Sequence, residues 1–362
     1  MFKYLKFSLA PVSLILSILF ASLGDNYIWY FFIGFSAFIL VGDIIFGEDN
    51  SVHEYNYPSI LNFMLYLNLP LLVILILVMI NVIDSQSTSS FIGYCLTIGL
   101  MLGGFGVNVG HELTHRKNKK FDMFFGNWLQ ALCWDNVFAI EHVYGHHKQV
   151  GLKEDGATAR RNEGIFYFMF RSTYNEYKNA YQIEKNRLNR KKKSFFSRDN
   201  KFIIGISRSI IVSFLIFFIG STTALFCYLI SAFISKILLE TINYVEHYGL
   251  VRVEGEPVKP RHSWNSNTLI SSAFTFNLTR HSSHHEKSHL KYWELKPYTN
   301  SPTMPQGYLS MIYLGLFAPF LFHRVMAKKL VDWDQRFANE EERELAKKQN
   351  MKSGIPLLVD SV

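Results

Sequence analysis

Nine of the thirteen histidines fall in four short groups whose spacing could bind metal ions. These groups are His111 and His115 in HELTH, His142, His146 and His147 in EHVYGHH, His247 in NYVEHYG, and His281, His284 and His285 in RHSSHH. Imidazoles three or four residues apart lie on one face of a helix, about 5–6 Å apart at Cβ. Because iron, copper, zinc and nickel all accept imidazole ligands, the pattern predicts a metal site and leaves the metal open.

The number of histidines favours two ions over one. HELTH has the spacing of the H-E-x-x-H helix of zinc proteases, so spacing alone does not exclude a hydrolase. A hydrolytic zinc takes three protein ligands and keeps one position for water. The nine clustered histidines exceed that need threefold. We therefore expect a site that holds two ions.

Four carboxylates lie inside or beside the histidine groups and are candidate catalytic or positioning residues. They are Glu112, Glu141, Asp155 and Glu246. A metal-bound imidazole commonly donates its second N–H to a carboxylate, which fixes the orientation of the ring. We expect some of these carboxylates to bind the ions and others to orient imidazoles.

The elements that must position these residues are apolar. The chain has 362 residues, of which 49% are hydrophobic and 16% aromatic. Six segments approach the roughly 20 residues that cross a bilayer as a helix, at about 7–24, 26–46, 60–83, 91–110, 202–220 and 224–245. The sequence predicts an all-α integral membrane protein with six transmembrane helices, arranged as three helical hairpins in a single membrane-embedded domain over residues 1–362.

The distribution of charge predicts which side of the membrane carries the histidines. After Lys3 and Lys6 no lysine or arginine occurs until Arg116, and a dense basic stretch then runs to Lys201. Lysine and arginine gather on the cytoplasmic side of membrane proteins. We therefore expect a histidine-rich helical cap on the cytoplasmic face of the cell inner membrane. Both termini and the segments 111–201 and 246–362 are expected on that side.

Two other interpretations of the charge are weaker. The basic residues that give the net charge of +8 are not spread as a binding stripe, so we expect no nucleic-acid partner. The basic start MFKYLK also fits a signal peptide. The second apolar segment follows almost at once, however, and this favours an uncleaved first helix.

The histidine groups carry a family resemblance. HELTHR, EHVYGHH, NYVEHYGL and LTRHSSHH, in this order, resemble the histidine boxes of the integral-membrane alkane 1-monooxygenases and of the related hydroxylase component of xylene monooxygenase. The first, second and last boxes also resemble those of membrane fatty acid desaturases, and the tyrosine-bearing NYVEHYG box favours the hydroxylases. KEDGATARR, RHSWNSN and YWELKPYTNSPTMPQGY extend the resemblance over most of the chain.

Some stretches separate the two hydroxylase branches. EHVYGHH, HSWNSN and RHSSHH look like the alkane branch, whereas DWDQRFANEEERELA at 332–346 resembles the tail of the xylene enzyme. Thr279 and Ser283 stand where the last alkane box usually has Gln and Asp. Neither departure replaces a histidine, so both bear on the substrate rather than on the reaction.

The resemblance implies a non-haem diiron centre with two iron ions (Fe2+/Fe3+). Such a centre uses O2 as co-substrate, inserts one oxygen atom into the terminal C–H bond of an alkane or alkyl side chain, and releases the other as water. All nine clustered histidines match the family's iron-binding positions, whereas His53, His262, His289 and His323 do not. His262 is expected to be a surface or interface residue.

Three alternative functions stay open at this point. The first is methyl-group hydroxylation of aromatic hydrocarbons, as in the xylene type. The second is a membrane fatty acyl desaturase with the same metal chemistry, which would yield a double bond in place of an alcohol. The third is a metal carrier or sensor, which is disfavoured because transport sites normally lie near the middle of the membrane.

The substrate and the electron donor follow from what the chain contains. A hydrocarbon would enter from the lipid bilayer, past the aromatic second segment (Trp29–Phe32 and Phe35) or the glycines of the fourth (Gly99, Gly103, Gly104, Gly106 and Gly110). The aromatic residues could equally form an interfacial belt. The glycines could equally serve close helix packing. The three cysteines form no C-x-x-C pair and no G-x-G-x-x-G turn occurs, so the chain has no redox cofactor motif of its own.

The electrons must therefore come from another protein. The resemblance implies rubredoxin or a ferredoxin-type donor, served by an NAD(P)H reductase. Arg190, Lys191, Lys192, Lys193 and Arg198 could dock an acidic donor, but anchoring to anionic lipid is the favoured role for this patch. We expect the apolar run 308–322 to be a membrane-associated or packed helix that supports the last box, and residues 332–350 to form one mixed-charge surface helix.

Overall fold

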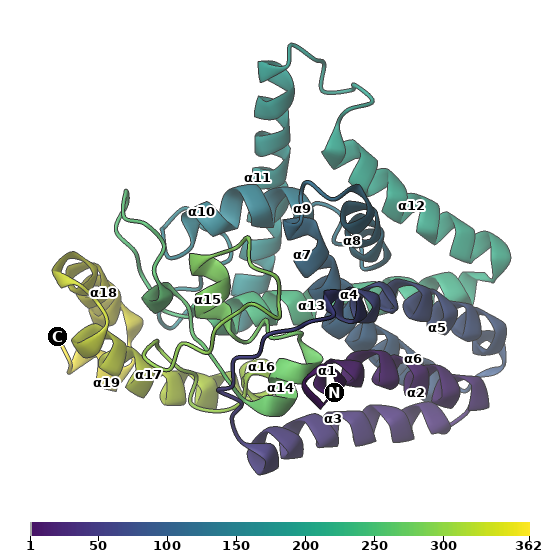
Figure 1. Ribbon diagram of the computed structural model, residues 1–362, viewed down its shortest axis with the longest axis horizontal. Helices are drawn as coiled ribbons and strands as arrows, with labels where there is room; N and C mark the ends of the chain where they lie inside the picture. The colour runs from purple at the N-terminus through teal and green to yellow at the C-terminus, as the bar shows by residue number, and fades with distance from the viewer. Residues whose placement is uncertain (1) are drawn as a thin grey trace.

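All regular structure in residues 2–362, the part of the chain that the computed structural model describes, is helical. Six helices are long and apolar enough to cross a membrane, and they are Lys3–Leu23, Tyr27–Phe46, Pro58–Ser85, Thr88–His115, Lys201–Ile219 and Thr222–His247. The predicted all-α class with six candidate spans is therefore confirmed. Most of the spans pack side by side, α12 leans away from them together with α11, and the remaining helices gather beside the spans (Figure 1).

Three of the six spans are single α-helices, and the other three are divided into shorter helical segments. Their parts are α1 (Phe2–Leu5), η1 (Lys6–Ser8) and α2 (Leu9–Leu23); α3 (Tyr27–Phe46); α4 (Pro58–Tyr66), α5 (Asn68–Val82) and η2 (Ile83–Ser85); α6 (Thr88–Met101), η3 (Leu102–Val107) and α7 (Asn108–His115); α12 (Lys201–Ile219); and α13 (Thr222–His247). The segment η3 is a π-helical turn. Such turns inside α-helices are frequent at functional sites, and η3 leads directly into the helix that carries HELTH.

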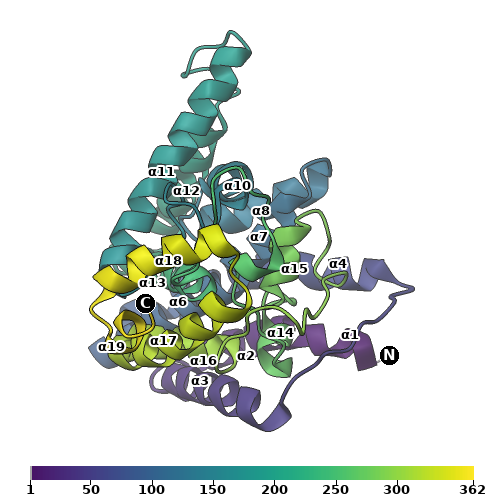
Figure 2. The same cartoon turned by 90° about the vertical axis from the view of Figure 1, so that its left-hand side faces the viewer.

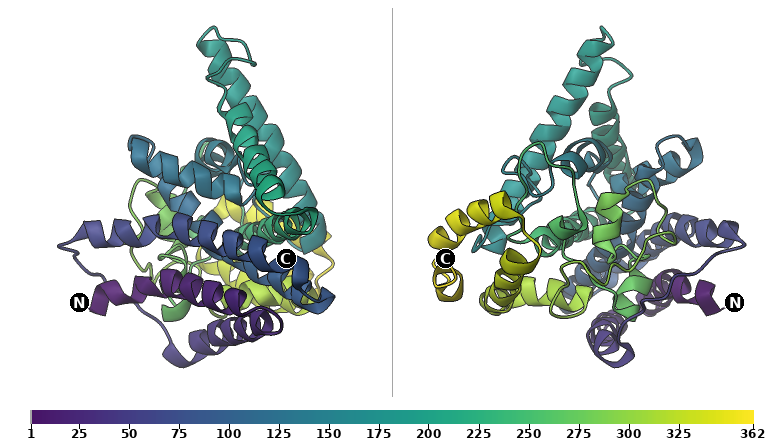
Figure 3. Two further views of the ribbon diagram at one scale, coloured as in Figure 1. Left: turned by 90° about the vertical axis from the view of Figure 1, so that its right-hand side faces the viewer. Right: turned by 60° about the vertical axis from the view of Figure 1, so that its left-hand side comes forward.

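The remaining helices form the cap. They are α8 (Lys120–Leu132), α9 (Phe138–Glu141), η4 (His142–His146), α10 (His147–Gln149), α11 (Ile165–Arg190), η5 (Pro260–His262), α14 (Leu269–Phe274), α15 (His281–Glu286), α16 (Tyr308–Phe317), α17 (Pro319–Arg336), α18 (Glu340–Ser353) and α19 (Pro356–Val359). The end of α11 and the start of α12 project from the rest of the molecule, and residues 190–198, five of them basic, lie at the tip of this hairpin (Figures 2 and 3).

Glycines let α6 and η3 approach α13. A Cβ atom added at Gly99 would lie 2.6 Å from the side chain of Ile234, and one at Gly103 would lie 2.9 Å from Leu238. Close helix packing therefore explains these two glycines. Gly104 is different, because no heavy atom lies within 4 Å of its added Cβ.

The apolar run 308–322 forms two helices. Pro319 begins α17 after the ten residues of α16, which are too few to cross a bilayer. The Tyr308 hydroxyl, at the start of α16, donates a hydrogen bond to Glu246. This contact agrees with the expectation of a packed helix that supports the histidine boxes.

The charged tail differs from its prediction. Residues 332–350 form the end of α17 and most of α18, with a break before Glu340. The break has a local cause, because Asn339 and Glu342 form a capping box that starts a new helix. The expectation of one helix was therefore wrong.

The tail is also anchored to the rest of the cap. The Glu342 carboxylate is fully buried and accepts hydrogen bonds from Arg261 and His262. Arg161 forms an ion pair with Asp334 at 2.6 Å. The tail is thus part of the support of the cap and not an independent surface helix.

Candidate metal centre

The first histidine group lies on α7, at the end of the fourth apolar helix. His111 and His115 are four residues apart on one helix face, and their Nε2 atoms lie 3.1 Å from each other. His111 is buried and His115 is half-buried. This helix brings two imidazoles out of the apolar bundle and into the cap.

The second group lies in a π-helical turn. The turn η4 covers His142–His146, and His147 follows at the start of α10. The i→i+5 bonding of a π-turn brings residues five apart together, and the Nε2 atoms of His142 and His147 lie 3.1 Å apart. In a regular α-helix residues five apart point to different faces. The π-turn is therefore what lets three histidines of one segment face the same site.

The third and fourth histidine groups complete the site and come from the later part of the chain. His281, His284 and His285 lie on the short helix α15, and His247 is the last residue of α13. The Nε2 atom of His284 lies 3.1 Å from that of His111, although the two residues are 173 positions apart. The structure thus brings all nine predicted histidines together.

The nine imidazoles form two adjoining clusters. The outer cluster consists of His111, His115, His142, His147 and His284. The inner cluster consists of His146, His247 and His285 together with His281, whose Nε2 lies 3.1 Å from that of His247. All four rings of the inner cluster are buried, whereas His115 and His147 of the outer cluster are half-buried. The rings of His147 and His285 stack at 4.4 Å and join the clusters.

This arrangement fits metal ions. Five pairs of Nε2 atoms lie 3.1 Å apart, which is the separation of neighbouring nitrogens around an ion with bonds of about 2.1 Å. Both ring nitrogens of His285 are buried without a hydrogen-bond partner, as is Nδ1 of His147. Buried polar atoms normally have partners, so these nitrogens are left for a ligand such as a metal ion.

Three of the four rings in the inner cluster have an oxygen atom close to Nδ1. Asp155 lies 3.0 Å from Nδ1 of His146, and Glu246 lies 3.1 Å from Nδ1 of His281 without being aligned for a hydrogen bond. The backbone carbonyl of His262 lies 3.1 Å from Nδ1 of His247. A partner on Nδ1 leaves Nε2 free for a metal and fixes the ring. Within residues 2–362 no imidazole of the outer cluster has an ion pair with a carboxylate.

Burial keeps most of the cap histidines neutral. Burial and the neighbouring imidazoles lower the pKa of His142, His147, His281 and His285 well below the ordinary value. The same causes lower the pKa of His284 to about 3. Neutral imidazole is the form that binds a metal, so these rings need not lose a proton before an ion binds.

His146 is the exception. Burial acts to lower its pKa, but the charge and hydrogen bond of Asp155 outweigh burial and raise the pKa above the ordinary value. The pKa of Asp155 is lowered, because His146 and Thr158 outweigh the opposing effect of burial. The His146 and Asp155 pair is therefore the most strongly polarised contact among these cap residues.

The other two predicted carboxylates do not touch an imidazole. Glu112 accepts hydrogen bonds from the Arg116 guanidinium at 2.7 Å and from the Tyr292 backbone N–H at 3.3 Å. Glu141 is 3.5 Å from the Asn179 amide, and burial raises its pKa to about 7. Of the four carboxylates, the structure brings only Asp155 and Glu246 to the imidazoles.

Sequence reasoning missed three features of the site. The five-residue spacing of His142 and His147 was a signal for the π-turn. His262 is fully buried, with Nε2 2.8 Å from Glu342, so the expected surface or interface position was wrong. Tyr308 contacts Glu246 from α16. The last two contacts join residues 60 or more positions apart, for which local spacing gives no signal.

Comparison with known proteins agrees with this geometry. A family model described as fatty acid desaturase matches residues 87–315, a range that contains all nine histidines. Alkane 1-monooxygenase 2 from Pseudomonas aeruginosa is 37% identical over 246 residues, which are 66% of this chain and 64% of that protein. Alkane 1-monooxygenase 1 from the same organism is 33% identical over 313 residues, or 80% of this chain and 79% of that protein.

A third relative aligns over nearly the whole chain. The xylene/toluene monooxygenase hydroxylase component from Pseudomonas putida is 30% identical over 369 residues, which are 99% of this chain and 97% of that protein. The chain thus spans just under two thirds of the first relative and almost all of the third.

Proposed function

We propose a reaction for this protein from a family premise: the chain belongs to the fatty acid desaturase family and, within it, to the membrane alkane 1-monooxygenases and xylene/toluene monooxygenase hydroxylase components. The protein hydroxylates the terminal methyl group of an alkane or alkyl side chain to a primary alcohol. One O2, two electrons and two protons are consumed for each alcohol and water formed. The observation that carries the proposal is the convergence of nine histidines into two adjoining clusters.

The two clusters hold two iron ions, one in each. Bound iron supplies the reductive activation of O2 and the insertion of one oxygen atom into the C–H bond. The chain supplies neutral imidazoles in fixed positions. Asp155 and the His262 carbonyl orient the rings of His146 and His247 through Nδ1, and the Glu246 carboxylate lies 3.1 Å from Nδ1 of His281. We infer that Asp155 and Glu246 are positioning residues, since each carboxylate lies within 3.1 Å of an imidazole Nδ1.

Glu141 and Glu112 have different roles. Glu141 and His142 both line a small polar pocket, and burial raises the pKa of the Glu141 carboxyl group, which favours a group that can hold and release a proton. Glu141 is our candidate for carrying protons to the site. Glu112 holds Arg116 and thereby fixes the end of α7.

The substrate reaches the site along the fourth span. Gly104 lies about two helical turns before His111 and has open space at its Cβ position. Next to Gly104 in the chain, Phe105 packs against Phe35 of α3, which also packs against Phe274. A hydrocarbon dissolved in the bilayer can lie beside these residues with its terminal methyl group toward the imidazoles.

The electron donor is rubredoxin or a ferredoxin-type protein, served by an NAD(P)H reductase. His147 is half-buried and is followed by the exposed Lys148, so a donor bound at this edge comes close to the outer cluster. The basic patch of residues 190–198 lies at the far end of α11 (Figure 2). We therefore favour Lys148 over the tip of the hairpin as part of the donor surface.

The protein lies in the inner membrane with the histidine side facing the cytoplasm. Lys6 forms an ion pair with Asp49 at 2.8 Å, and Arg280 donates a hydrogen bond to the Asp49 carbonyl. The helix α18, the second last of the chain, contacts His262 through Glu342. These contacts of Lys6 and of α18 support a position of both on the side of the histidines, which is the side that carries the basic residues.

Product analysis tests the proposal. Cells that express the chain with a rubredoxin and its reductase are given alkanes from pentane to hexadecane, or methylarenes, under isotopically labelled O2. We expect a primary alcohol that carries one labelled oxygen atom. The alignment of the xylene/toluene relative over 99% of the chain supports methylarenes as the second substrate class. An unsaturated product without labelled oxygen would establish a desaturase.

A further inference from the structure

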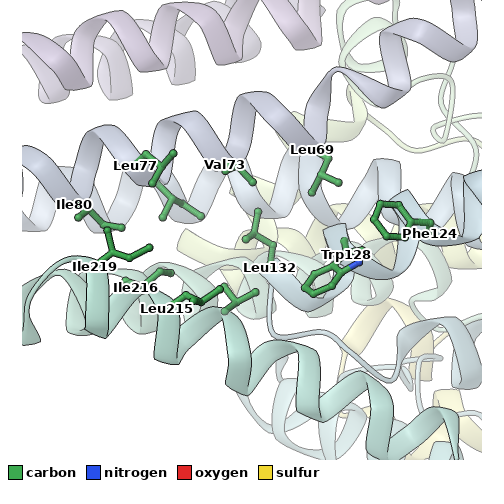
Figure 4. Close-up of a pocket in the computed structure, with 12 residues that line it drawn as sticks. Leu69, Val73, Leu77, Ile80, Phe124, Trp128, Leu132, Leu215, Ile216 and Ile219 are labelled. Carbon is green, nitrogen blue, oxygen red and sulfur yellow. The ribbon is translucent and has the colours of Figure 1, made fainter.

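An apolar groove runs along the bundle between α5, α8 and α12. Its volume is about 350 Å³, and the wall includes Val73 and Leu77 of α5, Trp128 of α8, and Leu215 and Ile219 of α12. The side chains from the three helices point into the space between them (Figure 4). Because α5 and α12 belong to candidate membrane spans, the groove lies at the depth of the hydrocarbon layer.

A basic pocket adjoins one end of this groove. It has a volume of about 370 Å³ and is lined by Lys117, Arg198, Lys201 and Arg208 among others. The same helices, α8 and α12, line both cavities. The Arg208 guanidinium lies 5.8 Å from the centre of the Trp128 ring, where the pocket meets the groove.

The positive charges of the pocket contact aromatic rings but no acidic partner among residues 2–362, since the Lys117 ammonium lies 4.3 Å from the centre of the Tyr144 ring. Among residues 2–362, none of its four lysines and arginines forms an ion pair, and the one acidic residue of the lining, Asp199, pairs with Lys193 outside it. Burial and the charges of Lys148 and Lys201 lower the pKa of Lys117. An ionisable side chain inside a membrane span, such as Arg208, is costly without a partner. The pocket is therefore built for an anion.

Asn136 provides a hydrogen-bond acceptor in the basic pocket. Its side chain lines the pocket, is 6% exposed, and donates from Nδ2 to the Ser209 hydroxyl at 3.0 Å. Its Oδ1 atom is buried and has no hydrogen-bond partner. Since a buried acceptor without a donor is unfavourable, this atom favours a ligand that carries a hydroxyl group.

We propose that the pocket and the groove together bind one anionic phospholipid with a hydroxylated headgroup, of the phosphatidylglycerol type. The phosphate lies among Lys117, Lys201 and Arg208, and a headgroup hydroxyl donates to Oδ1 of Asn136. One acyl chain lies in the groove. From Arg208 to Ile219 the helix rises about 16 Å, which is close to half of the roughly 30 Å hydrocarbon core and thus to the depth of one leaflet.

The combination of a basic pocket and an apolar groove favours this ligand over two others. A soluble acidic protein would use the basic pocket but not a groove within the membrane. A hydrocarbon substrate would use the groove but not the basic pocket. Basic pockets between membrane helices on the cytoplasmic side are recognised sites for anionic lipid headgroups.

Native mass spectrometry of the full-length protein tests the proposal. The purified protein is delipidated in mild detergent and titrated with phosphatidylglycerol or with phosphatidylcholine of the same acyl chains. We expect one bound phosphatidylglycerol, with an affinity about tenfold or more above that of phosphatidylcholine. The double variant Lys201→Gln with Arg208→Gln should lose this preference.

Two further variants separate the headgroup from the acyl chain. Leu215→Trp fills the groove and should weaken both lipids, because the acyl chain is displaced. The double variant Lys347→Gln with Lys348→Gln removes the same amount of charge from the exposed face of α18 and should bind as the unmodified protein does. Monodisperse elution and unchanged iron content show that a variant has folded. If either the Lys201 and Arg208 variant or the Leu215 variant fails to fold, the other variant still tests the proposal.

Four results would overturn the proposal. Equal binding of the two lipids by the unmodified protein would show a general annular contact. Unchanged lipid affinity in the Lys201 and Arg208 variant, with weakened binding of the electron donor, would make the pocket a protein docking surface. Competition by glycerol phosphate as strong as that by the whole lipid would make it a site for soluble anions. Displacement of the lipid by dodecane would assign the groove to the substrate.

Discussion

The two histidine clusters are built differently, although their ligand types are the same. The inner cluster is fully buried, and three of its four rings have an oxygen atom at Nδ1, from Asp155, Glu246 and the His262 carbonyl. The outer cluster has five rings, two of them half-buried, and no carboxylate partner within the described residues 2–362. Oriented rings hold an ion rigidly, whereas rings without such partners can adjust. We infer that the inner ion is the anchored one and that the outer ion is nearer the donor.

Removing one histidine from each cluster should have the largest effect. We expect His142→Ala and His281→Ala to abolish turnover, because each removes one metal ligand. Bound iron should fall in both variants, by up to about half, which is one ion of the two. His142→Ala leaves four rings in the outer cluster, and His281→Ala leaves three in the inner one, so the inner variant should lose its ion more completely. Iron analysis and a product assay measure both effects.

The matched control for these variants is His289→Ala. His289 is exposed and lies only four residues beyond His285, outside both clusters. Its variant should keep full activity and iron. Retained turnover in His142→Ala or His281→Ala would remove those residues from the set of ligands.

Changes of the orienting carboxylates sharpen the comparison. Asp155→Asn and Glu246→Gln should lower iron affinity or activity about 10- to 100-fold, which is the usual effect of losing a partner of a metal-bound imidazole. The loss should fall on the inner ion alone. A chelator titration that follows the release of the two ions separately would show this.

Glu112→Gln is the contrasting change, because Glu112 pairs with Arg116 and not with an imidazole. It should lower the thermal stability and leave iron affinity unchanged. If Glu112→Gln instead released iron as Asp155→Asn does, the division of the carboxylates into two kinds would be wrong.

A smaller effect is expected at the substrate path toward the clusters. Gly104→Leu fills the open space on the fourth span, so it should reduce activity on long alkanes more than on short ones, by about tenfold, since a side chain in an apolar pocket changes binding by about 1–3 kcal/mol. Gly34→Leu, on α3, also adds a side chain where no atom lies within 4 Å. It should leave the chain-length profile as it is. A profile that does not change in Gly104→Leu would place the path elsewhere.

The smallest effect concerns the electron donor. Lys148→Glu places a negative charge beside the half-buried His147 and should raise the KM for an acidic donor several-fold with little change in kcat, because rim charges act mainly on association. Lys192→Glu, at the distant tip of α11 and α12, should have a weaker effect. The opposite order would locate the donor at the tip.

The parts of the fold that depend on local composition could be predicted from the sequence. The six apolar segments became six helices, and the nine clustered histidines met because each group follows a span or lies in the segments between spans. Helix periodicity correctly placed His111 beside His115. The same rule did not foresee the contact of His142 with His147, which depends on a π-turn.

The parts that depend on tertiary contacts could not be predicted. Glu112 and Glu246 both adjoin a histidine in the sequence, yet only Glu246 faces an imidazole, because Arg116 and the Tyr292 N–H hold Glu112. His262 became buried through Glu342, 80 positions away. The tail broke at Asn339, where a capping box competes with a continuous helix.

The central claim is that two clusters of neutral imidazoles hold two irons in one chain. The most direct test is the metal content of the purified full-length protein, measured together with Mössbauer spectra of enriched iron. Our account predicts two irons per chain in two distinguishable environments, with the signal of the inner iron altered in Asp155→Asn. A single iron per chain, or zinc in place of iron in an active preparation, would contradict it.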